Sequence, residues 1–350
     1  MIKLSNITLP VDYNDNTILS EAAKQLKINK KEIADFEMLR LSVDARKKNK
    51  VHYTATVGIT LKGGSAKENE IIKKNKKLSL QTVKPYTYYV KNIKKPSLPP
   101  VVVGAGPAGL FCGLVLAQAG ACPVIIERGK EVEQRQKDVE SFWKTGKLNE
   151  NSNVQFGEGG AGTFSDGKLN TGTKDIRSKK VLQEFVKHGA PKEILYNAKP
   201  HIGTDKLPSV VKGIREEIIR LGGKVLFESQ LTNIFINNGA VCAAEVQSGN
   251  TVTKIDCNNL VLALGHSARD TFEMLNNLGF VMEQKPFSVG ARIEHLQSSI
   301  NKAQYGEFAN KGNLGAADYK LAVHLNNGRG VYTFCMCPGG TVVAAASEKN

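Results

Sequence analysis

The sequence has few cysteines and lacks a long uninterrupted apolar run. Six cysteines among 350 residues are too few for a disulfide scaffold, so we expect mostly reduced thiols in the core. The most apolar stretch, residues 101–121, is broken by glycines and a proline, whereas a membrane span needs about 18 or more apolar residues. The first 15 residues also lack the pattern of a secretory signal. We therefore expect a cytoplasmic protein with no membrane partner.

Two cysteines, Cys335 and Cys337, stand two positions apart in the segment FCMCPGG. A redox or metal-binding role is one interpretation of such a pair. No second pair completes a zinc site, so we expect no metal and favour packing for both thiols.

Positive charge is concentrated in the first quarter of the chain. Residues 1–96 contain 20 Lys+Arg against 9 Asp+Glu, so most of the net charge of +15 lies there. A basic surface can attract RNA or acidic partners, but it can also serve solubility alone. The third expected strand offers only Tyr53 for stacking on a base. We therefore prefer the solubility interpretation and keep RNA as a weaker alternative.

Residues 1–95 have the pattern of a domain of their own. Alternating apolar residues and amphipathic segments predict the order strand, helix, two strands, helix and strand. That order is typical of a small α+β ferredoxin-like domain. The last of these strands contains Pro85, so we expect it at a sheet edge. A proline-rich linker, residues 94–100, follows.

The next domain, residues 99–285, opens with a glycine-rich turn between a short apolar strand and a helix. The turn has the spacing G-x-G-x-x-G at Gly104, Gly106 and Gly109. These glycines should permit, in order, a tight turn, close approach of a pyrophosphate and close packing of the helix on the strand. Glu127 ends the next strand, where a carboxylate can accept hydrogen bonds from an adenosine ribose. The sequence therefore predicts a Rossmann-like dinucleotide site.

The segments farther along the chain favour FAD over a nicotinamide dinucleotide at this site. Three short strands between residues 231 and 257 predict an antiparallel β-meander, and a buried strand ending at Gly265 follows it. Many FAD-binding oxidoreductases have this plan, and the sequence has no second G-x-G-x-x-G domain. We expect FAD, a small-molecule substrate and NAD(P)H as a transient reductant. Residues 286–350 should begin a substrate domain.

The segment VQFGEGGAGTFSDGKL, residues 154–169, contains five glycines. A flexible linker and a purely structural turn are two interpretations. A cofactor loop is the third, and we favour it because apolar residues frame the glycines. Its backbone could pass beside the flavin and the pyrophosphate, where side chains would clash. Thr163 and Ser165 could add hydroxyl donors.

The expected cofactor-binding residues come from the two glycine-rich segments and the strands beside them. They are Gly104, Gly106, Pro107, Ala108, Gly109, Glu127, Arg128, Gly157, Gly159, Gly160, Ala161, Gly162, Thr163, Leu231 and Gly265. The candidate catalytic residue is Arg292, because a guanidinium suits a reduced flavin or an anionic substrate. His201 and His266 are further polar candidates, for which a surface or packing role is the simpler interpretation.

The chain resembles the family of FAD-dependent proteins known as NAD(FAD)-utilising dehydrogenases, which occurs in bacteria and has plastid relatives. The likeness covers nearly the whole chain and is carried by NVQFGEGGAGTFSDGKL, KPHIGTDKL, LALGHSARDTFEML, KPFSVGARIEH, LGAADYKL and FCMCPGGTVVAA. It implies an FAD-binding, oxidoreductase-like protein and no particular substrate. Members of the family extend past this length and add another glycine-rich segment to the FAD site, so we expect a C-terminally truncated chain.

The leading hypothesis from the sequence is therefore an FAD-dependent oxidoreductase that acts on a small molecule. A flavoprotein that binds or modifies RNA is the first alternative. A binding or regulatory protein with structural FAD is the second.

Overall fold

The computed structural model describes residues 1–75, 80–82, 86, 88–164, 167–334, 336–340 and 342–349. The chain forms two compact units, each built from more than one segment. Unit 1 comprises residues 1–87, 192–200 and 292–342, and unit 2 comprises residues 88–191, 201–291 and 343–350. The sequence-based division instead uses the consecutive ranges 1–95, 99–285 and 286–350.

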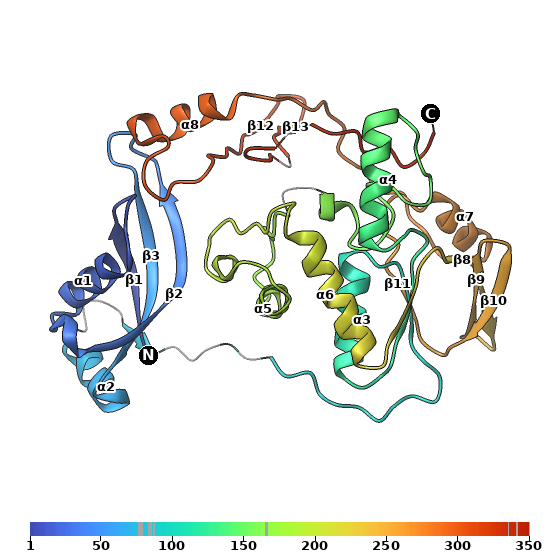
Figure 1. Ribbon diagram of the computed structural model, residues 1–350, viewed down its shortest axis with the longest axis horizontal. Coiled ribbons are helices and arrows are strands. Elements are labelled where there is room, and N and C mark those ends of the chain that lie inside the picture. The colour runs from blue at the N-terminus through green and yellow to red at the C-terminus, as the bar shows by residue number, and fades with distance from the viewer. Residues whose placement is uncertain are drawn as a thin grey trace. The chain divides into compact units, whose positions relative to one another are not determined.

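Unit 1 contains a four-stranded sheet with two helices on one face (Figure 1). The strand order is β2-β3-β1-β4, and the neighbouring strands run antiparallel. Its elements are β1 (Ile2–Leu9), α1 (Asp15–Leu26), η1 (Lys30–Glu32), β2 (Ile33–Asp44), β3 (His52–Leu61), α2 (Gly64–Lys74), β4 (Gln81–Thr82), η4 (Lys192–Leu195), α8 (Gln297–Tyr305), η5 (Gly306–Phe308), β12 (Ala322–His324) and β13 (Gly330–Tyr332).

Distant segments complete the core of unit 1. The backbone of Leu41 in β2 donates to Tyr196 (2.8 Å) and accepts from Ala198 (2.9 Å), which attaches residues 192–200 to the sheet. The hydroxyl of Tyr53 donates to the carbonyl of Asn313 (2.7 Å). These contacts explain why the N-terminal residues share a compact unit with segments far along the sequence.

The last strand that the sequence predicts in this sheet is short in the described residues. β4 pairs with Ile2 and Lys3 of β1 through only two residues. Pro85, which suggested an edge position, lies outside the described residues.

Unit 2 is an α/β structure around a four-stranded parallel sheet of order β11-β5-β6-β7. Among the described residues, none of the helices has the length and apolar character needed to cross a bilayer. The elements are β5 (Val101–Val103), α3 (Pro107–Gln118), β6 (Val124–Ile126), α4 (Val132–Thr145), η3 (Ala161–Phe164), α5 (Ser178–Lys187), α6 (Leu207–Arg220), β7 (Lys224–Leu226), β8 (Gln230–Asn237), β9 (Ala240–Ser248), β10 (Thr251–Asp256), β11 (Leu260–Leu262) and α7 (Arg269–Asn277).

The two faces of the parallel sheet have different partners. Alternate residues of a strand point to opposite faces, and Ile125 faces α3 and α6 beside Gly113 and Ile218. Val103 and Ile126 instead share a core with β8, β9 and α7. The three strands β8, β9 and β10 form the expected antiparallel meander. The sheet therefore lies between two helices and this meander.

The strand that the sequence predicts as buried, before Gly265, is an edge strand. β11 pairs with β5 on one side only, and no further partner strand lies beside it in the described part of the chain. Val261 and Leu262 of this strand are each 38% exposed. The apolar sequence alone did not distinguish an edge position from a central one.

Close packing at Gly109 generates a testable prediction for the fold. A Cβ atom there would lie 1.7 Å from the carbonyl oxygen of Gly104, which is a fixed backbone atom. Gly109→Ala should therefore lower the free energy of unfolding by about 3 kcal/mol, as overpacking does. Circular dichroism during urea titration measures this change. The control is Gly172→Ala, where a Cβ meets no atom within 4 Å. Equal stability of the two variants would contradict the packing argument.

Candidate functional site

The first glycine of the G-x-G-x-x-G turn makes the sharp change of direction after β5. Gly104 has φ +103°, a conformation that side chains disfavour, and its amide donates to Ile126 (2.7 Å). A Cβ at Gly104 would lie 2.4 Å from the carbonyl oxygen of Ala263. The predicted tight turn at Gly104 and close helix packing at Gly109 are both confirmed.

The second glycine of the turn has open space around it. Gly106 is the N-cap of α3, with Pro107 at the first helical position. A Cβ at Gly106 would have only the Cα of Gly160 within 4 Å, at 4.0 Å. Because first-turn amides lack partners inside their helix, Ala108 and Gly109 bring donors to the same end. The turn thus combines open space with the positive end of a helix dipole.

Glu127, the acid predicted to bind a ribose, already accepts hydrogen bonds from three backbone amides. Its Oε2 accepts from Ala105 (2.7 Å), and its Oε1 accepts from Gly129 (2.8 Å) and Gly157 (3.1 Å). The side chain is buried. A carboxylate has about four acceptor positions, so three amides do not exhaust it. Binding to a ribose stays a prediction.

A recess of about 40 Å³ lies at the carboxyl ends of the parallel strands. It brings together the predicted residues Gly104, Glu127, Arg128 and Leu231. Several lining residues had not been expected, and they come from three separate segments: Phe156, Ser229, Gln230, Leu264, Ala268 and Thr271. A ligand crevice at this edge is common in open α/β sheets.

The side chain of Arg128 is held at the recess. Its guanidinium lies 4.5 Å from the centre of the Phe156 ring. It also donates to Asp270 (2.7 Å) and to the hydroxyl of Thr271 (3.0 Å). Gln230 donates to the same Asp270 carboxylate (2.8 Å). Arg128 therefore connects the segment that follows β6 to the start of α7.

The glycine loop lies directly against the G-x-G-x-x-G turn. The amide of Gly159 donates to the carbonyl of Ala105 (2.8 Å). A Cβ on Gly160, which has φ +65°, would lie 2.9 Å from Pro107. Residues Ala161 and Gly162 are exposed next to this contact. Two segments that the sequence analysis selected separately are thus neighbours.

Not every loop residue is placed for a ligand. Thr163 is fully buried, and its hydroxyl has no hydrogen-bond partner in the described structure. A Cβ on Gly159 would come within 2.1 Å of that hydroxyl oxygen, so Thr163 explains the glycine there. Ser165, the other expected hydroxyl donor, lies outside the described residues.

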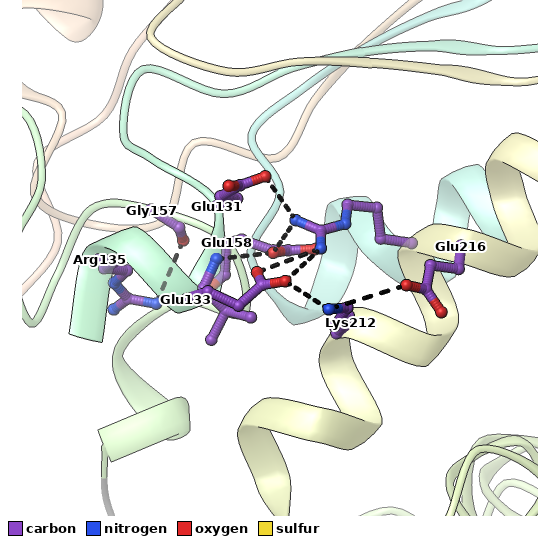
Figure 2. Close-up of polar contacts among 9 residues, drawn as sticks. Glu131, Glu133, Arg135, Gly157, Glu158, Lys212 and Glu216 are labelled. Atoms are coloured by element: carbon purple, nitrogen blue, oxygen red, sulfur yellow. Dashed lines mark hydrogen bonds and ion pairs between the residues drawn. The ribbon is translucent and has the colours of Figure 1, made fainter. Parts of the chain in front are cut away.

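A buried ion-pair network supports the loop, and the sequence analysis missed it. Glu158 of the loop is fully buried and pairs with Arg215 of α6 (3.0 Å). The same guanidinium pairs with Glu131 (3.3 Å) and Glu133 (3.0 Å) at the start of α4 (Figure 2). Lys212 adds a pair to Glu133 (2.9 Å). The network joins the loop to two helices.

A second buried arginine, Arg135 of α4, was also missed. It is fully buried, and five of its hydrogen bonds go to carbonyls of residues 153–160. Its spacing from Val132 and Val139, three and four positions away, places it on the buried face of α4. An arginine at an apolar position of the helix was the available signal.

The carboxyl group of Glu158 titrates far from its ordinary range. The pKa of Glu158 is raised to about 7, mainly by burial, and the nearby Glu133 and Glu131 act in the same direction. The amide of Val132 (2.8 Å) and Arg215 act in the opposite direction. Three carboxylates share one guanidinium, and Oε1 of Glu158 has no hydrogen-bond partner in the described structure. The net effect is a raised pKa.

The remaining candidates do not line the recess, although Gly265 directly follows Leu264, which does. Arg292 is exposed and belongs to unit 1, so its catalytic role stays a prediction. Gly265 and His266 follow β11 and are exposed. The backbone of His201 forms an isolated antiparallel β-bridge with that of Lys168. The described residues contain no group of three or more His, Cys, Asp or Glu side chains arranged for a metal.

Two further expectations concern the cysteine pair and Tyr53, the aromatic residue of the RNA alternative. Cys335 lies outside the described residues, and Cys337 is half-buried. Tyr53 is buried within the helix-side core of unit 1. It is therefore not presented for stacking on a base.

Comparison with known families matches both ends of the chain. Residues 286–350 match the family described as "FAD-dependent protein, C-terminal domain-like". Residues 1–60 match a domain of unknown function, DUF8436. An uncharacterized protein of Clostridium beijerinckii is 46% identical over 352 residues, which cover 100% of this chain and 64% of that protein. The chain thus spans less than two thirds of this relative's length.

Similarity to solved structures is weak. THI4 of Thermovibrio ammonificans has a TM-score of 0.37 and 16% identity, covering 62% of this chain and 69% of that one. The 3-ketosteroid-Δ4-(5α)-dehydrogenase of Rhodococcus jostii has a TM-score of 0.34 and 14% identity, covering 54% and 51%. Likenesses of this size do not establish a shared fold.

The raised pKa of Glu158 generates a prediction for the pH dependence of stability. The folded state keeps this proton up to a pH of about 7, whereas the unfolded chain releases it near the ordinary value of 4.5. Stability should therefore fall as the pH rises through this interval, by about 3 kcal/mol. The Glu158→Gln variant should lack this decrease. Thermal unfolding across the interval measures the difference.

The matched control is Glu216→Gln, which changes an exposed member of the same network. It should keep the pH dependence of the wild type. Parallel pH profiles for the wild type and Glu158→Gln would contradict the assignment.

Proposed function

We propose that this chain is a flavoprotein that binds FAD at the carboxyl ends of its parallel sheet and serves an oxidoreductase reaction. The observation that carries the proposal is the contact between the G-x-G-x-x-G turn and the glycine loop, beside the open space at Gly106. The match of residues 286–350 to a family of FAD-dependent proteins supports it.

The residues at the site fit the parts of FAD in order. The pyrophosphate would meet Gly106 and the first-turn amides of α3, because a helix N-terminus attracts anions. Glu127 and Arg128 would hold the adenosine end, with Leu231 on the recess wall. The loop residues Gly157, Gly159, Gly160, Ala161 and Gly162 would lie beside the pyrophosphate and the flavin. Gly106 and Gly162, where a Cβ would meet no atom closer than 4.0 Å, leave room for a ligand.

The adenosine end has to open before it is occupied. A recess of about 40 Å³ has room for a few water molecules, not for a nucleoside. Arg128 lines it and contacts Phe156 and Asp270. We propose that Arg128 leaves Asp270 when an adenosine enters, since Arg128 itself lines the recess together with Phe156 and Thr271. The guanidinium would then cover the base.

Bound FAD would supply the electron-transfer chemistry, and the protein would supply position and electrostatics. The loop and the turn would hold the cofactor with backbone donors and exclude side chains from its path. Arg292 is proposed to meet an anionic substrate or the reduced flavin. NAD(P)H as a transient reductant, a small-molecule substrate and a cytoplasmic location stay proposals from the sequence.

We also propose a fold class for each of the two units. The antiparallel order β2-β3-β1-β4, with a helix in each crossover, supports a ferredoxin-like domain in unit 1. The parallel order β11-β5-β6-β7 with its glycine-rich turn supports a Rossmann-like domain in unit 2.

Gly106 offers a clean test of FAD binding. A Cβ there meets no atom closer than 4.0 Å, and its φ of −68° suits any residue. Gly106→Val should therefore fold normally but lose FAD, because the branched side chain would occupy the space for the pyrophosphate. Absorbance of bound flavin and circular dichroism measure the two properties. Gly172→Val, at another open position, is the control and should keep FAD. Full flavin occupancy in Gly106→Val would refute the site.

The oxidoreductase assignment has a separate test. Under anaerobic conditions, NADH or NADPH should bleach the absorbance of the bound flavin, because a transient reductant transfers a hydride to it. Stopped-flow absorbance with each nucleotide measures the rate. Flavin that stays oxidised with both nucleotides would favour a structural role for FAD.

A further inference from the structure

The guanidinium of Arg135 is bound almost entirely by the glycine loop. It is fully buried, and no carboxylate of the described residues makes an ion pair with it. Its nitrogens donate instead to five backbone carbonyls: Asn153 (2.8 Å), Val154 (2.9 Å), Gly157 (3.4 Å), Gly160 (2.9 Å) and Glu158. Figure 2 shows the guanidinium pointing to the carbonyl of Gly157. One guanidinium thus binds five carbonyls of the segment 153–160.

The loop sequence is adapted to this side chain. A Cβ at Gly157 would lie 2.3 Å from Cδ of Arg135, so the arginine occupies the space that any other residue would need. Gly157 also has φ +120°, which favours glycine. The ring of Phe164, at the far end of the loop, lies 4.7 Å from the guanidinium. Both ends of the segment therefore contact one side chain.

Fixing the carbonyls also fixes the direction of the amides. A peptide group is planar and trans, so the N–H of each following residue points away from the carbonyl. The carbonyl of Gly157 accepts a hydrogen bond from Arg135, and the amide on the other side of that peptide group, from Glu158, donates to the carbonyl of Lys130 (3.1 Å). Glu158 in the same way directs the amide of Gly159 to Ala105 (2.8 Å) in the G-x-G-x-x-G turn. Arg135 therefore determines how the loop meets the turn.

We propose that Arg135 is a positioning residue that holds residues 157–160 against the G-x-G-x-x-G turn in the arrangement that binds FAD. This inference rests on the proposed function, since it assigns a role at the same site. Arg135 acts through the loop and does not itself contact the cofactor.

Arginine suits this role better than lysine. Its planar guanidinium has five N–H donors, which match the five carbonyls, whereas an ammonium has three. Burial lowers the pKa of Arg135 to about 10, which leaves the group charged at neutral pH. Lysine would therefore keep the charge but leave loop carbonyls without donors.

The test compares Arg135→Lys and Arg135→Ala with the control Lys137→Met, which removes an exposed cation two positions later on α4. Fluorescence titration gives the dissociation constant of FAD, and hydrogen–deuterium exchange of residues 153–160 reports the loop without FAD. Arg135→Lys should weaken FAD binding by about tenfold or more, because losing a hydrogen bond from a charged donor changes a dissociation constant by about that factor. It should also speed exchange in the loop, and Lys137→Met should change neither.

Chemical rescue separates positioning from a general loss of stability. Guanidinium ion added to Arg135→Ala should restore FAD binding, and the same concentration of neutral urea should not. If Arg135→Ala does not fold, Arg135→Lys decides alone. Wild-type affinity or wild-type loop exchange in Arg135→Lys would overturn the inference. A wild-type protein without FAD affinity would instead overturn the proposed function, and this inference with it.

Discussion

Five backbone carbonyls of the glycine loop converge on the buried guanidinium of Arg135, and the order of the candidate site depends on that cation. A charge buried away from water is unfavourable unless all of its donors are bonded. Here the loop carbonyls provide the acceptors, so the loop and the arginine need each other. A segment with so many glycines would otherwise have many backbone conformations.

Glu127 acts on the same region with the opposite charge. It accepts hydrogen bonds from amides of the turn, of the residues after β6 and of the loop, whereas Arg135 donates hydrogen bonds to carbonyls. Gly157 is bonded to both: its amide donates to Glu127 (3.1 Å) and its carbonyl accepts from Arg135 (3.4 Å). The pair of Glu158 with Arg215 attaches the next residue to α6. The surface proposed for the cofactor is thus supported by buried charges.

Local sequence predicted the parts of this site that depend on local geometry. The spacing of Gly104, Gly106 and Gly109 identified the turn, because Gly104 needs a positive φ there and Gly109 has to clear the carbonyl of Gly104 five residues earlier. The meander followed from strand alternation and its turns. The contact between turn and loop could be predicted only as a hypothesis, because more than forty residues separate Ala105 from Gly159.

The rest required tertiary structure. In the sequence, Arg135 cannot be distinguished from the exposed charged residues of an amphipathic helix, whereas in the structure it is fully buried. β11 has the apolar sequence of a central strand, but its edge position follows from pairing alone. The attachment of residues 192–200 to β2 likewise has no local signal, because it consists of backbone hydrogen bonds. Local patterns specify elements and turns, whereas buried polar partners are set by the assembled fold.

The most direct test of the account is the identity of any chromophore that copurifies with the wild-type protein. The protein is purified without added cofactor, denatured, and the released small molecules are separated and weighed by mass spectrometry. The account predicts FAD, released without covalent attachment and in an amount that rises when FAD is supplied during refolding. A protein that is folded by circular dichroism, yet releases no flavin and takes up none on refolding with FAD, would contradict it.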